Sequence, residues 1–588
     1  MLTTLAAPAF AGTWYIEDGD ITISAGESGN NVTQNNETTY GDTGTVITGK
    51  SDKNTVTIEA KDKGDKVEVK FENVNIDASS RSEAAVSVTG KGDTNIELDG
   101  DNELKSGAGH AGLEHNKTDT SGELTIQDKD NNGSLEAAGG FKGAGIGSAG
   151  SNDAQVKITG GNITATSDDW GAGIGSGSYG TGTVEITGGE INATGGYLGA
   201  GIGGGCNGSG NVTISGGTIT AAGSDGAAGI GGGYYNGATV TITGDAVIKN
   251  ASNTKYGAGI GGGNGSDGNV TISGNAKIEN ATGGYGAAGI GGGAFSSPDK
   301  IGNGNVVIKD NAKIDNVQGG AYGAGIGGGI YGLSNVTIEG NTKVNATGGA
   351  GGAAIGGGAG AENNSDNNGN QITIKSNENG SPTINAVGGG TDEGKKIVIG
   401  GAGIGAGCES NADADITLEG KVTITATAGK DNVAIGANGI EQEFSGLAEG
   451  SSITRYDPEG NDITLPTDPV PAVPSSSGGS SADASVQESV FPGLVVTDKD
   501  GQRISYTSTQ SSNTLTVCVG RFTASLRASL ATLRQLRAEG IDTITFQTIL
   551  CSTTLSVDEL LAMGGEDTEV VLTHHIRSST LTVGGKAV

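Results

Sequence analysis

Apolar and polar residues alternate in short segments that recur along most of the chain. The commonest segment has the form Val-x-Ile, in which two branched residues flank one outward residue. A period of two is typical of a β-strand with one buried face, because successive side chains point to opposite sides. The outward residue is Lys, Glu or Thr in every copy except one, where it is Val307. The buried pairs are Val156/Ile158, Val184/Ile186, Val212/Ile214, Val240/Ile242, Val270/Ile272, Val306/Ile308, Val336/Ile338 and Ile372/Ile374.

A second segment, Ala-Gly-Ile-Gly or a close variant, sets the length of the repeat. Its Ile stands at 146, 174, 202, 230, 260, 290, 326, 355, 404 and 435. The steps between them are 28, 28, 28, 30, 30, 36, 29, 49 and 31 residues, so one unit has about 29 residues. A third apolar segment follows each Val-x-Ile and is centred on Ile163, Ile191, Ile219, Ile248, Ile278, Ile314 and Val344.

Three short strands per repeat, joined by turns rich in Gly and Asn, predict an all-β fold, a right-handed parallel β-helix. One coil cannot bury its few branched residues alone, whereas stacked coils bury like residues on like and pair every strand. Residues 14 to 455 correspond to about fifteen coils and a rod of roughly 70 Å.

Composition narrows the possible partners. The chain has 113 Gly among 588 residues, 34% apolar residues and a net charge of −32. This charge argues against nucleic acid or an anionic membrane surface as the main partner, and leaves cations and neutral or cationic polymers. We expect no insertion into a membrane, because no apolar run approaches the roughly 18 residues needed to span a bilayer.

The chain divides into four parts by composition. Residues 1–11 resemble the end of a secretory signal, with Ala9-Phe10-Ala11 as the cleavage site, and the alternative is an apolar tail. Residues 12–462 are the predicted β-helix, and residues 463–489 form a linker rich in Pro, Ser and Gly. Residues 490–588 predict a small α/β domain. Separately, the signal-like start leads us to expect that the protein is secreted or held on a bacterial cell surface.

Within the predicted α/β domain, one helix carries Leu526, Leu530, Leu533 and Leu536 on one face and ends at Gly540. Residues 556–559 fit a capping box that opens a second helix. The strand segments are residues 503–508, 514–519, 543–547 and 570–573.

Four cysteines are too few for a disulfide scaffold. Cys206 and Cys408 occupy the same repeat position about six coils, or roughly 29 Å, apart, so they cannot pair. Cys518 and Cys551 lie in the C-terminal unit and are either a disulfide or two thiols.

The order of several segments resembles a family of secreted carbohydrate-binding β-helix proteins from bacterial surfaces, which is similar in fold to pectate lyases. The resemblance covers about residues 14–445 and includes the repeated GAGIG. It implies binding of plant-type extracellular polysaccharide, with calcium as the possible cofactor and without established catalysis. The segments are ITI at 21–23, VEVKFENVNIDA at 67–78, AAVSV at 84–88, TNIELDGDNELKSG at 94–107, GELTIQD at 122–128, GSLEAAGG at 133–140 and VKITGGNITAT at 156–166.

Aromatic residues are the main candidates for contact with sugar. They fall four or five residues before the repeat Ile, and a second set follows five residues after it at Tyr179, Tyr235, Phe295 and Tyr331. Exposed rings can stack on the apolar faces of sugars, although a purely structural ladder is the alternative. The first set, which we assign to carbohydrate binding, is Phe141, Trp170, Tyr197, Tyr256, Tyr285 and Tyr322.

One segment has the spacing of calcium ligands. Asp128, Asp130 and Asn132 reproduce the first half of a calcium loop, but the residue eleven positions after Asp128 is Gly139, where a bidentate carboxylate is needed. The segment is therefore either a looser Ca²⁺ site or a simple turn.

Other chemistries find less support in the sequence. Gly199–Gly204 fits the dinucleotide fingerprint but opens no helix. Asp168-Asp169 is the one adjacent acidic pair within the regular repeats, and Lys157 is a conceivable lyase base. The row Thr213, Thr241 and Thr271 would suit an ice-binding face, and Val307 interrupts its continuation.

We therefore expect a non-catalytic, adhesin-like protein that binds extracellular polysaccharide. The alternatives are a passive surface stalk or scaffold, and a polysaccharide lyase or glycoside hydrolase. The sequence leaves the oligomeric state open.

Overall fold

The computed structural model describes residues 11–294, 297, 300–363, 369–469 and 493–587, the last range with gaps at 499–500, 505, 512, 520, 522, 549–550, 566–567 and 576–577. The chain forms two compact units, Met1–Val473 and Pro474–Val588. Most of the expected signal remnant, and residues 470–489 of the expected linker, lie outside the described residues. Each unit is described separately.

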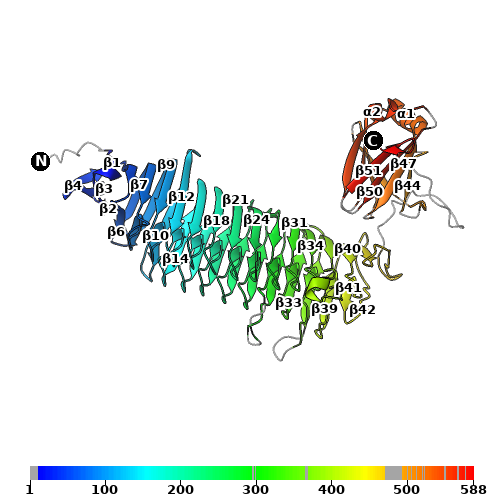
Figure 1. The fold of residues 1–588 in the computed structure, drawn as a ribbon, viewed down its shortest axis with the longest axis horizontal. Helices are drawn as coiled ribbons and strands as arrows, with labels where there is room; N and C mark the ends of the chain where they lie inside the picture. The colour runs from blue at the N-terminus through cyan, green and yellow to red at the C-terminus, as the bar shows by residue number, and fades with distance from the viewer. Residues whose placement is uncertain are drawn as a thin grey trace. The chain divides into compact units, whose positions relative to one another are not determined.

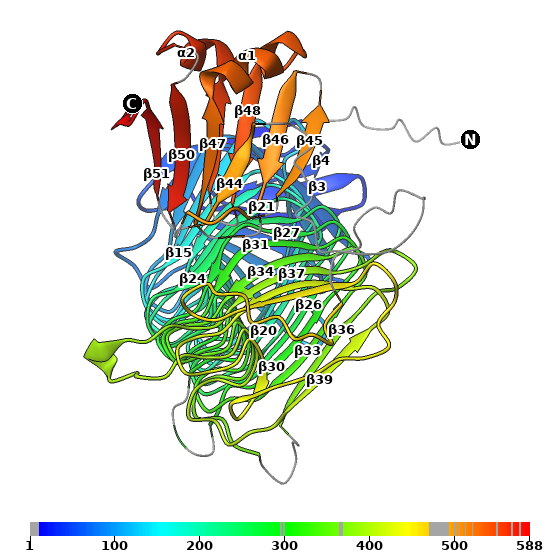
Figure 2. The same cartoon turned by 90° about the vertical axis from the view of Figure 1, so that its right-hand side faces the viewer.

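The first unit is a parallel β-helix of about 16 turns, as predicted (Figure 1). Its strands join in one 43-stranded sheet, and each strand pairs with the equivalent strands of the coils before and after it. Figure 2 looks along the stack and shows the coils superimposed around a common interior. Three columns of strands make up the regular coils.

The first column contains the Val-x-Ile segments, paired in parallel from coil to coil. Its strands are β11 (Leu124–Gln127), β14 (Asp153–Ile158), β17 (Gly182–Ile186), β20 (Gly210–Ile214), β23 (Ala238–Ile242), β26 (Gly268–Ile272), β30 (Gly304–Ile308), β33 (Ser334–Glu339), β36 (Asn370–Lys375) and β39 (Ala414–Glu419).

The second column contains the apolar segment that follows Val-x-Ile. Its strands are β12 (Gly133–Gly139), β15 (Asn162–Ser167), β18 (Glu190–Thr194), β21 (Thr218–Gly223), β24 (Val247–Asn253), β27 (Lys277–Ile278), β28 (Ala281–Thr282), β31 (Lys313–Gln318), β34 (Lys343–Thr347), β37 (Thr383–Val387), β40 (Thr423–Thr427) and β43 (Ser452–Tyr456).

The third column contains very short strands built on the repeat Ile. Its strands are β10 (Leu113–Lys117), β13 (Ile146–Gly147), β16 (Ile174–Gly175), β19 (Ile202–Gly203), β22 (Ile230–Gly231), β25 (Ile260–Gly261), β29 (Ile290–Gly291), β32 (Ile326–Gly327), β35 (Ile355–Gly356), β38 (Ile404–Gly405) and β41 (Ile435–Ala437).

The interior is one continuous core of branched side chains from all three columns. The repeat Ile residues from Ile146 to Ile435 are fully buried. The Gly that follows each of them has a left-handed backbone, with φ of +131° at Gly203. A Cβ atom on Gly203 would lie 2.1 Å from the carbonyl oxygen of Gly231 in the next coil, so only glycine fits there.

The N-terminal coils are irregular, as expected for the end of a stack. Strands β2 (Ile21–Gly26), β3 (Gly29–Gln34) and β4 (Glu37–Asp42) form an antiparallel meander that covers the first parallel edge. The remaining N-terminal strands are β1 (Thr13–Tyr15), β5 (Val46–Ser51), β6 (Val56–Ala60), β7 (Lys66–Asp77), β8 (Val86–Gly90) and β9 (Asp93–Lys105), with one short helix, η1 (Ile16–Asp18).

The C-terminal end of the stack is closed by a buried arginine in β43. Arg455 is completely buried and donates to both carboxylate oxygens of Asp468, at 2.6 and 2.9 Å, and to Glu441 at 2.5 Å. Burial alone would lower the pKa of Arg455, but its hydrogen bonds to Asp468 and Glu441 outweigh this and raise the pKa. Residues 463–469, which we expected to open the linker, therefore pack on the last coil.

The second unit contains two sheets and two short helices. The five-stranded sheet comprises β44 (Val495–Thr497), β47 (Ala524–Ser529), β50 (Glu569–His575), β51 (Ser578–Val583) and β52 (Lys586–Ala587). The four-stranded sheet comprises β45 (Thr507–Ser511), β46 (Thr514–Cys518), β48 (Thr543–Gln547) and β49 (Ser552–Ser556). The helices are α1 (Leu530–Ala538) and α2 (Val557–Leu561).

The first helix of this unit begins later than predicted. The Ser529 hydroxyl accepts from the Thr532 N–H and caps α1, so Leu526 lies before the helix, in β47 opposite Leu572. The Ser556 hydroxyl accepts from the Glu559 N–H at the start of α2, as the capping-box pattern predicted.

The disulfide between Cys518 and Cys551 is not formed. Cys518 Sγ donates to Gln547 Oε1 at 3.1 Å, and Cys551 Sγ donates to the His575 carbonyl at 3.3 Å. Strand β48 lies between β46, which ends at Cys518, and β49, which begins directly after Cys551. Two strand spacings of about 4.8 Å exceed the Cα separation that a disulfide tolerates.

Candidate functional site

The turns on either side of the third column meet along one edge of the β-helix. In the regular coils, the residue four positions after the repeat Ile donates its backbone N–H to the preceding coil. The acceptor there is the carbonyl of the residue four positions before that coil's own repeat Ile. This bond is 3.1 Å from Ser178 to Lys142, 2.6 Å from Cys206 to Trp170 and 2.8 Å from Ala359 to Tyr322. Positions four and five before and after the repeat Ile therefore share one edge, which we call the aromatic ridge.

Every aromatic residue between 140 and 440 occupies one of these four positions. The two sets that the sequence separates are therefore parts of one surface in the structure, and Tyr234 belongs to it as well. Phe295 lies outside the described residues. The aromatic residues of the ridge are Phe141, Trp170, Tyr179, Tyr197, Tyr234, Tyr235, Tyr256, Tyr285, Tyr322 and Tyr331.

Most of these rings are open to solvent. Six rings are exposed, by fractions that run from 40% at Phe141 to 58% at Tyr179. The other four, which are half-buried, are Trp170, Tyr234, Tyr235 and Tyr322. All six rings predicted to bind carbohydrate lie on the ridge. Three ring contacts join neighbouring coils: Phe141–Trp170 at 5.3 Å between centroids, Tyr256–Tyr285 at 6.3 Å and Tyr285–Tyr322 at 5.6 Å.

Five of the rings sit on backbone that bulky residues rarely adopt. The φ angles are +65° at Trp170, +66° at Tyr179, +62° at Tyr235, +75° at Tyr322 and +62° at Tyr331. Such left-handed residues cost about 1–3 kcal/mol each and gather at functional sites. Glycine occupies the same positions in other coils, at Gly265, Gly286, Gly351 and Gly360. The fold therefore accepts glycine at these turns and does not itself require the rings.

Lysine ammonium groups lie over two ring clusters of the ridge. Lys142 Nζ is 5.2 Å from the Phe141 ring centre and 5.1 Å from that of Trp170. Lys300 Nζ is 4.2 Å from the ring centre of Tyr235. All three distances are those of a cation held against a π-face.

Two tyrosines on the ridge share a hydroxyl contact. Tyr234 Oη donates to Tyr235 Oη at 2.6 Å, and the ring centres are 3.7 Å apart. Burial, followed by the bond to Tyr235, raises the pKa of Tyr234 to about 12. The Tyr234 hydroxyl therefore stays neutral at pH 7 and can serve as donor and acceptor.

Carboxylates border the rings. Asp169 pairs with Tyr197 through an isolated parallel bridge, and its Oδ1 atom is buried without a hydrogen-bond partner in the structure. Burial, and then the charge of Asp168, raise the pKa of the Asp169 carboxyl. Among the described residues, no group of three or more His, Cys, Asp or Glu side chains is placed to hold a metal.

An insertion covers one end of the ridge. The 49-residue step between Ile355 and Ile404 contains the short helix η2 (Glu393–Lys395), and Tyr322 Oη donates to the Lys395 carbonyl at 2.8 Å. Ile397 packs there with Ala359 and Cys408. Tyr322 is therefore half-buried and marks where the ridge ends.

The two ridge cysteines are buried thiols. Desolvation by burial, with smaller contributions from Asp169 and Glu409 respectively, raises the pKa of Cys206 and of Cys408 to about 11. At neutral pH neither is a thiolate, so neither is an activated nucleophile.

Asp128 has a structural role in its turn. Its two carboxylate oxygens accept from the N–H groups of Asn132 and Gly133 at 3.1 and 3.0 Å. Its oxygens thus close the turn before β12, and this geometry adds no support for calcium at Asp128, Asp130 and Asn132.

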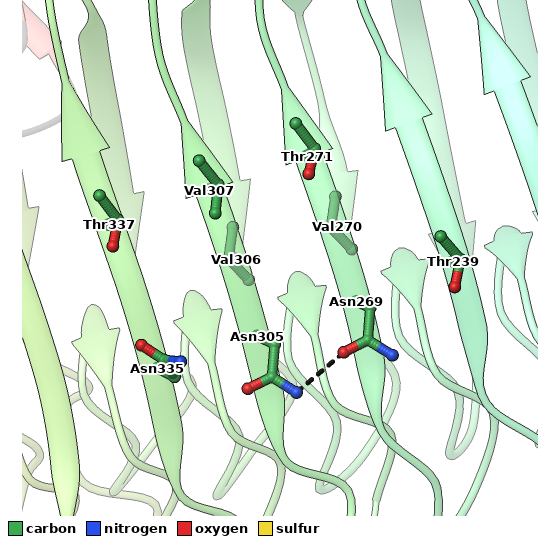
Figure 3. A pocket seen from close by; sticks show the side chains of 9 residues that line it. All are labelled: Thr239, Asn269, Val270, Thr271, Asn305, Val306, Val307, Asn335 and Thr337. Carbon is green, nitrogen blue, oxygen red and sulfur yellow. Dashed lines mark hydrogen bonds between the residues drawn. The ribbon is translucent and has the colours of Figure 1, made fainter.

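The outer face of the first column is flat and largely uncharged over several coils. A shallow depression of about 230 Å³ lies on β23, β26, β30 and β33, lined by Asn and Thr side chains with Val307 among them (Figure 3). Asn305 Nδ2 donates to Asn269 Oδ1 at 2.9 Å across it. Its lining contains no titratable group.

The residues considered for catalysis are dispersed. Lys157 Nζ lies 3.3 Å from Glu185 and 3.8 Å from Glu123, which makes it part of an ion-pair row on the first column. His115 is buried, and His110 Nδ1 lies 2.8 Å from Glu114 Oε2.

Comparison with known proteins agrees with this geometry. Four segments match the family described as Beta helix repeat: residues 156–178, 184–206, 212–234 and 270–294. The chain is similar to that family in these coils. Each segment starts at the first Val of a first-column strand and ends on the ridge four residues after the repeat Ile. No curated protein and no solved structure matches the chain significantly.

Sequence reasoning found the rings but missed the surface that they share. It treated the rings before and after the repeat Ile as two ladders, because adjacency across a turn depends on hydrogen bonds between coils. The signal in the sequence was their restriction to four repeat positions.

Proposed function

We propose that the β-helix binds extracellular polysaccharide through the aromatic ridge, without cleaving it, as an adhesin-like protein of a bacterial surface. The observation that carries this proposal is the gathering of ten aromatic rings on one edge of the β-helix, six of them exposed and five of them on left-handed backbone where other coils use glycine.

The physical basis is the chemistry of the sugar ring. Its C–H faces are apolar and stack on aromatic rings, while its hydroxyls need nearby donors and acceptors. Tyrosine hydroxyls, Asn207 and Asp168 supply such groups along the ridge. Several weak contacts on one polymer add up, because after the first contact the others are intramolecular.

The test is affinity electrophoresis through gels that contain defined polysaccharides, preceded by a glycan array with and without calcium. Trp170→Gly and Tyr197→Ala, alone and together, suit the backbone of each site. We expect the double variant to lose most of the retardation that the wild type shows. Tyr40→Ala is the matched control, because Tyr40 is 75% exposed but lies in β4, away from the ridge.

Two outcomes would contradict the proposal. Blank arrays in both conditions would favour a passive stalk, and undiminished retardation of the double variant would make the ridge structural. Release of unsaturated or reducing sugar ends from a bound polymer would instead indicate a lyase or hydrolase.

A further inference from the structure

Two ring clusters of the aromatic ridge already hold an ammonium group from the chain itself. Lys142 Nζ lies almost equally far from the Phe141 and Trp170 ring centres, 5.2 and 5.1 Å, and these rings are 5.3 Å apart. Lys300 Nζ lies 4.2 Å from the Tyr235 ring centre. A pair of rings from adjacent coils, Phe141 and Trp170, therefore accepts a cation in this protein, as does the single ring of Tyr235.

A third cluster has similar spacing. The ring centres are 6.3 Å apart for Tyr256–Tyr285 and 5.6 Å apart for Tyr285–Tyr322, with interplanar angles of 88° and 77°. Tyr256 is 43% exposed and Tyr285 is 41% exposed. Among the described residues, the recorded cation–ring contacts involve other rings than these three.

The nearest lysine in sequence is bound elsewhere. Lys255 precedes Tyr256, but its ammonium is paired with the Asp225 carboxylate, whose hydrogen bond and charge raise the pKa of Lys255. Two rings of the third cluster, Tyr256 and Tyr285, thus stay exposed in a chain whose net charge is −32. Both features favour a positively charged ligand, because the face of an aromatic ring carries partial negative charge.

We propose that the Tyr256–Tyr285–Tyr322 cluster binds an ammonium group of the polysaccharide, so that the ligand is a polymer of amino sugars with free amines. This inference rests on the proposed function and specifies its substrate class. Stacking on sugar faces positions the chain along the ridge, and the ammonium occupies the cluster as Lys142 occupies the first one.

The experiment compares two probes of equal length by calorimetry: the β-1,4-linked hexamer of glucosamine and its fully N-acetylated counterpart. We expect the free amine to bind about fivefold more tightly per ammonium held, because acetylation removes the charge and leaves the sugar face. Tyr256→Leu/Tyr285→Leu keeps the apolar bulk and removes the π-faces. It should abolish this preference, because it weakens binding of the glucosamine hexamer more than binding of the acetylated hexamer.

Lys142→Asn supplies an independent gain of function. Asn tolerates the left-handed backbone at position 142, where φ is +69°, and its side chain carries no charge. The variant should free the Phe141–Trp170 cluster and raise the affinity for the glucosamine hexamer. The acetylated hexamer serves as the comparison, because its affinity should rise less than that of the glucosamine hexamer.

The outcomes separate the inference from the function on which it rests. Equal binding of both hexamers would overturn the amine preference and keep carbohydrate binding, whereas binding of neither would overturn the proposed function as well. If the Leu double variant still prefers the amine, the preference comes from the net negative charge of the chain and not from the tyrosine cluster, which contradicts the proposal. Tyrosine-dependent capture of hexalysine but not of the glucosamine hexamer would assign the cluster to a peptide and contradict the proposal.

Discussion

The left-handed turn positions of the aromatic ridge hold either glycine or a larger residue whose backbone is strained there. Tyr331 and Gly360 stand at the same position of adjacent coils, with φ of +62° and +69°. The glycines after the repeat Ile have no such freedom, because the next coil fills the space where a side chain would lie. The same residue type therefore has two physical roles within one repeat.

Gly203→Ala tests the second role. Its Cβ would lie 2.1 Å from the Gly231 carbonyl oxygen, and the left-handed backbone adds strain, so we expect a loss of more than about 2 kcal/mol in unfolding free energy. Urea denaturation of both variants measures the change. Gly64→Ala is the control, because a Cβ there meets nothing within 4 Å; equal midpoints for the two variants would refute the packing argument.

Residue pattern alone identified the buried positions of the coils correctly. Val156, Ile158 and Ile163 are all buried, as the period of two requires. The pattern could not show that Asp128 closes a turn, because a loop of carboxylates and amides has the same residues whether it binds backbone N–H groups or a cation. The structure shows the turn contacts of Asp128, and the calcium site stays a prediction.

At the scale of elements, the C-terminal end of the stack depends on polar contacts that lie outside the repeat pattern. Arg455 joins β43 to Asp468 and Glu441, residues with no repeat partner. Sequence analysis assigned residues 463–469 to a linker because Pro and Thr dominate there. A repeat pattern cannot predict one buried ion pair outside the repeat. It also could not predict the start of α1, because the apolar face begins at Leu526 whereas the capping residue is Ser529.

Arg455→Met should weaken the last coil. Removing one partner of a buried ion pair costs about 3–5 kcal/mol, because Asp468 and Glu441 remain without compensation. Hydrogen exchange should show faster exchange of the amides in β40 and β43. Lys66→Met is the control: its pair with Glu68, at 2.6 Å, is exposed and contributes less than about 1 kcal/mol. Unchanged protection of β43 in Arg455→Met would show that the cap is dispensable.

His115 in β10 makes the N-terminal coils sensitive to acid. Burial lowers the pKa of His115 below its ordinary 6.5, although the Val88 and Gly122 carbonyls oppose the shift. Between pH 6.5 and the lowered pKa, His115 is therefore protonated in the unfolded chain but not in the folded one. Stability is present above pH 6.5 and falls as the pH drops from 6.5 to the lowered pKa, by at most about 1.4 kcal/mol per unit.

Denaturation of wild type and His115→Gln at pH 7.5 and 5 measures this contribution. The wild type should lose more stability between the two values than the variant, since His574 and the carboxylates are common to both. Equal losses would remove His115 as the cause.

At the scale of the molecule, in-register pairing makes one coil an exchangeable unit. Val184 pairs with Val212 and Ile202 with Ile230, each 28 residues apart. This regularity explains why the fold was predictable from the chain. The aromatic ridge was not, because it arises from contacts between the turns of successive coils rather than from any one repeat.

Deletion of residues 184–211 removes one whole coil and joins Thr183 to Val212. We expect a folded protein with an unfolding midpoint close to that of the wild type, since each coil contacts only its neighbours. Deletion of residues 198–211 is the control, because it removes β19 and the first two residues of β20 and so breaks the third column between β16 and β22. Circular dichroism and urea denaturation distinguish the two, and a misfolded 28-residue deletion would contradict the modular description.

The covers at the two ends of the stack also limit its size. The antiparallel meander at β2–β4 and the segment held by Asp468 each occupy an edge whose N–H and C=O groups would otherwise be unpaired. Bare edges of a repeat array are complementary to each other, so uncovered chains could join head to tail and grow into a fibre. The non-repeating residues at each end thus prevent further coils from stacking on the β-helix, and its length stays fixed.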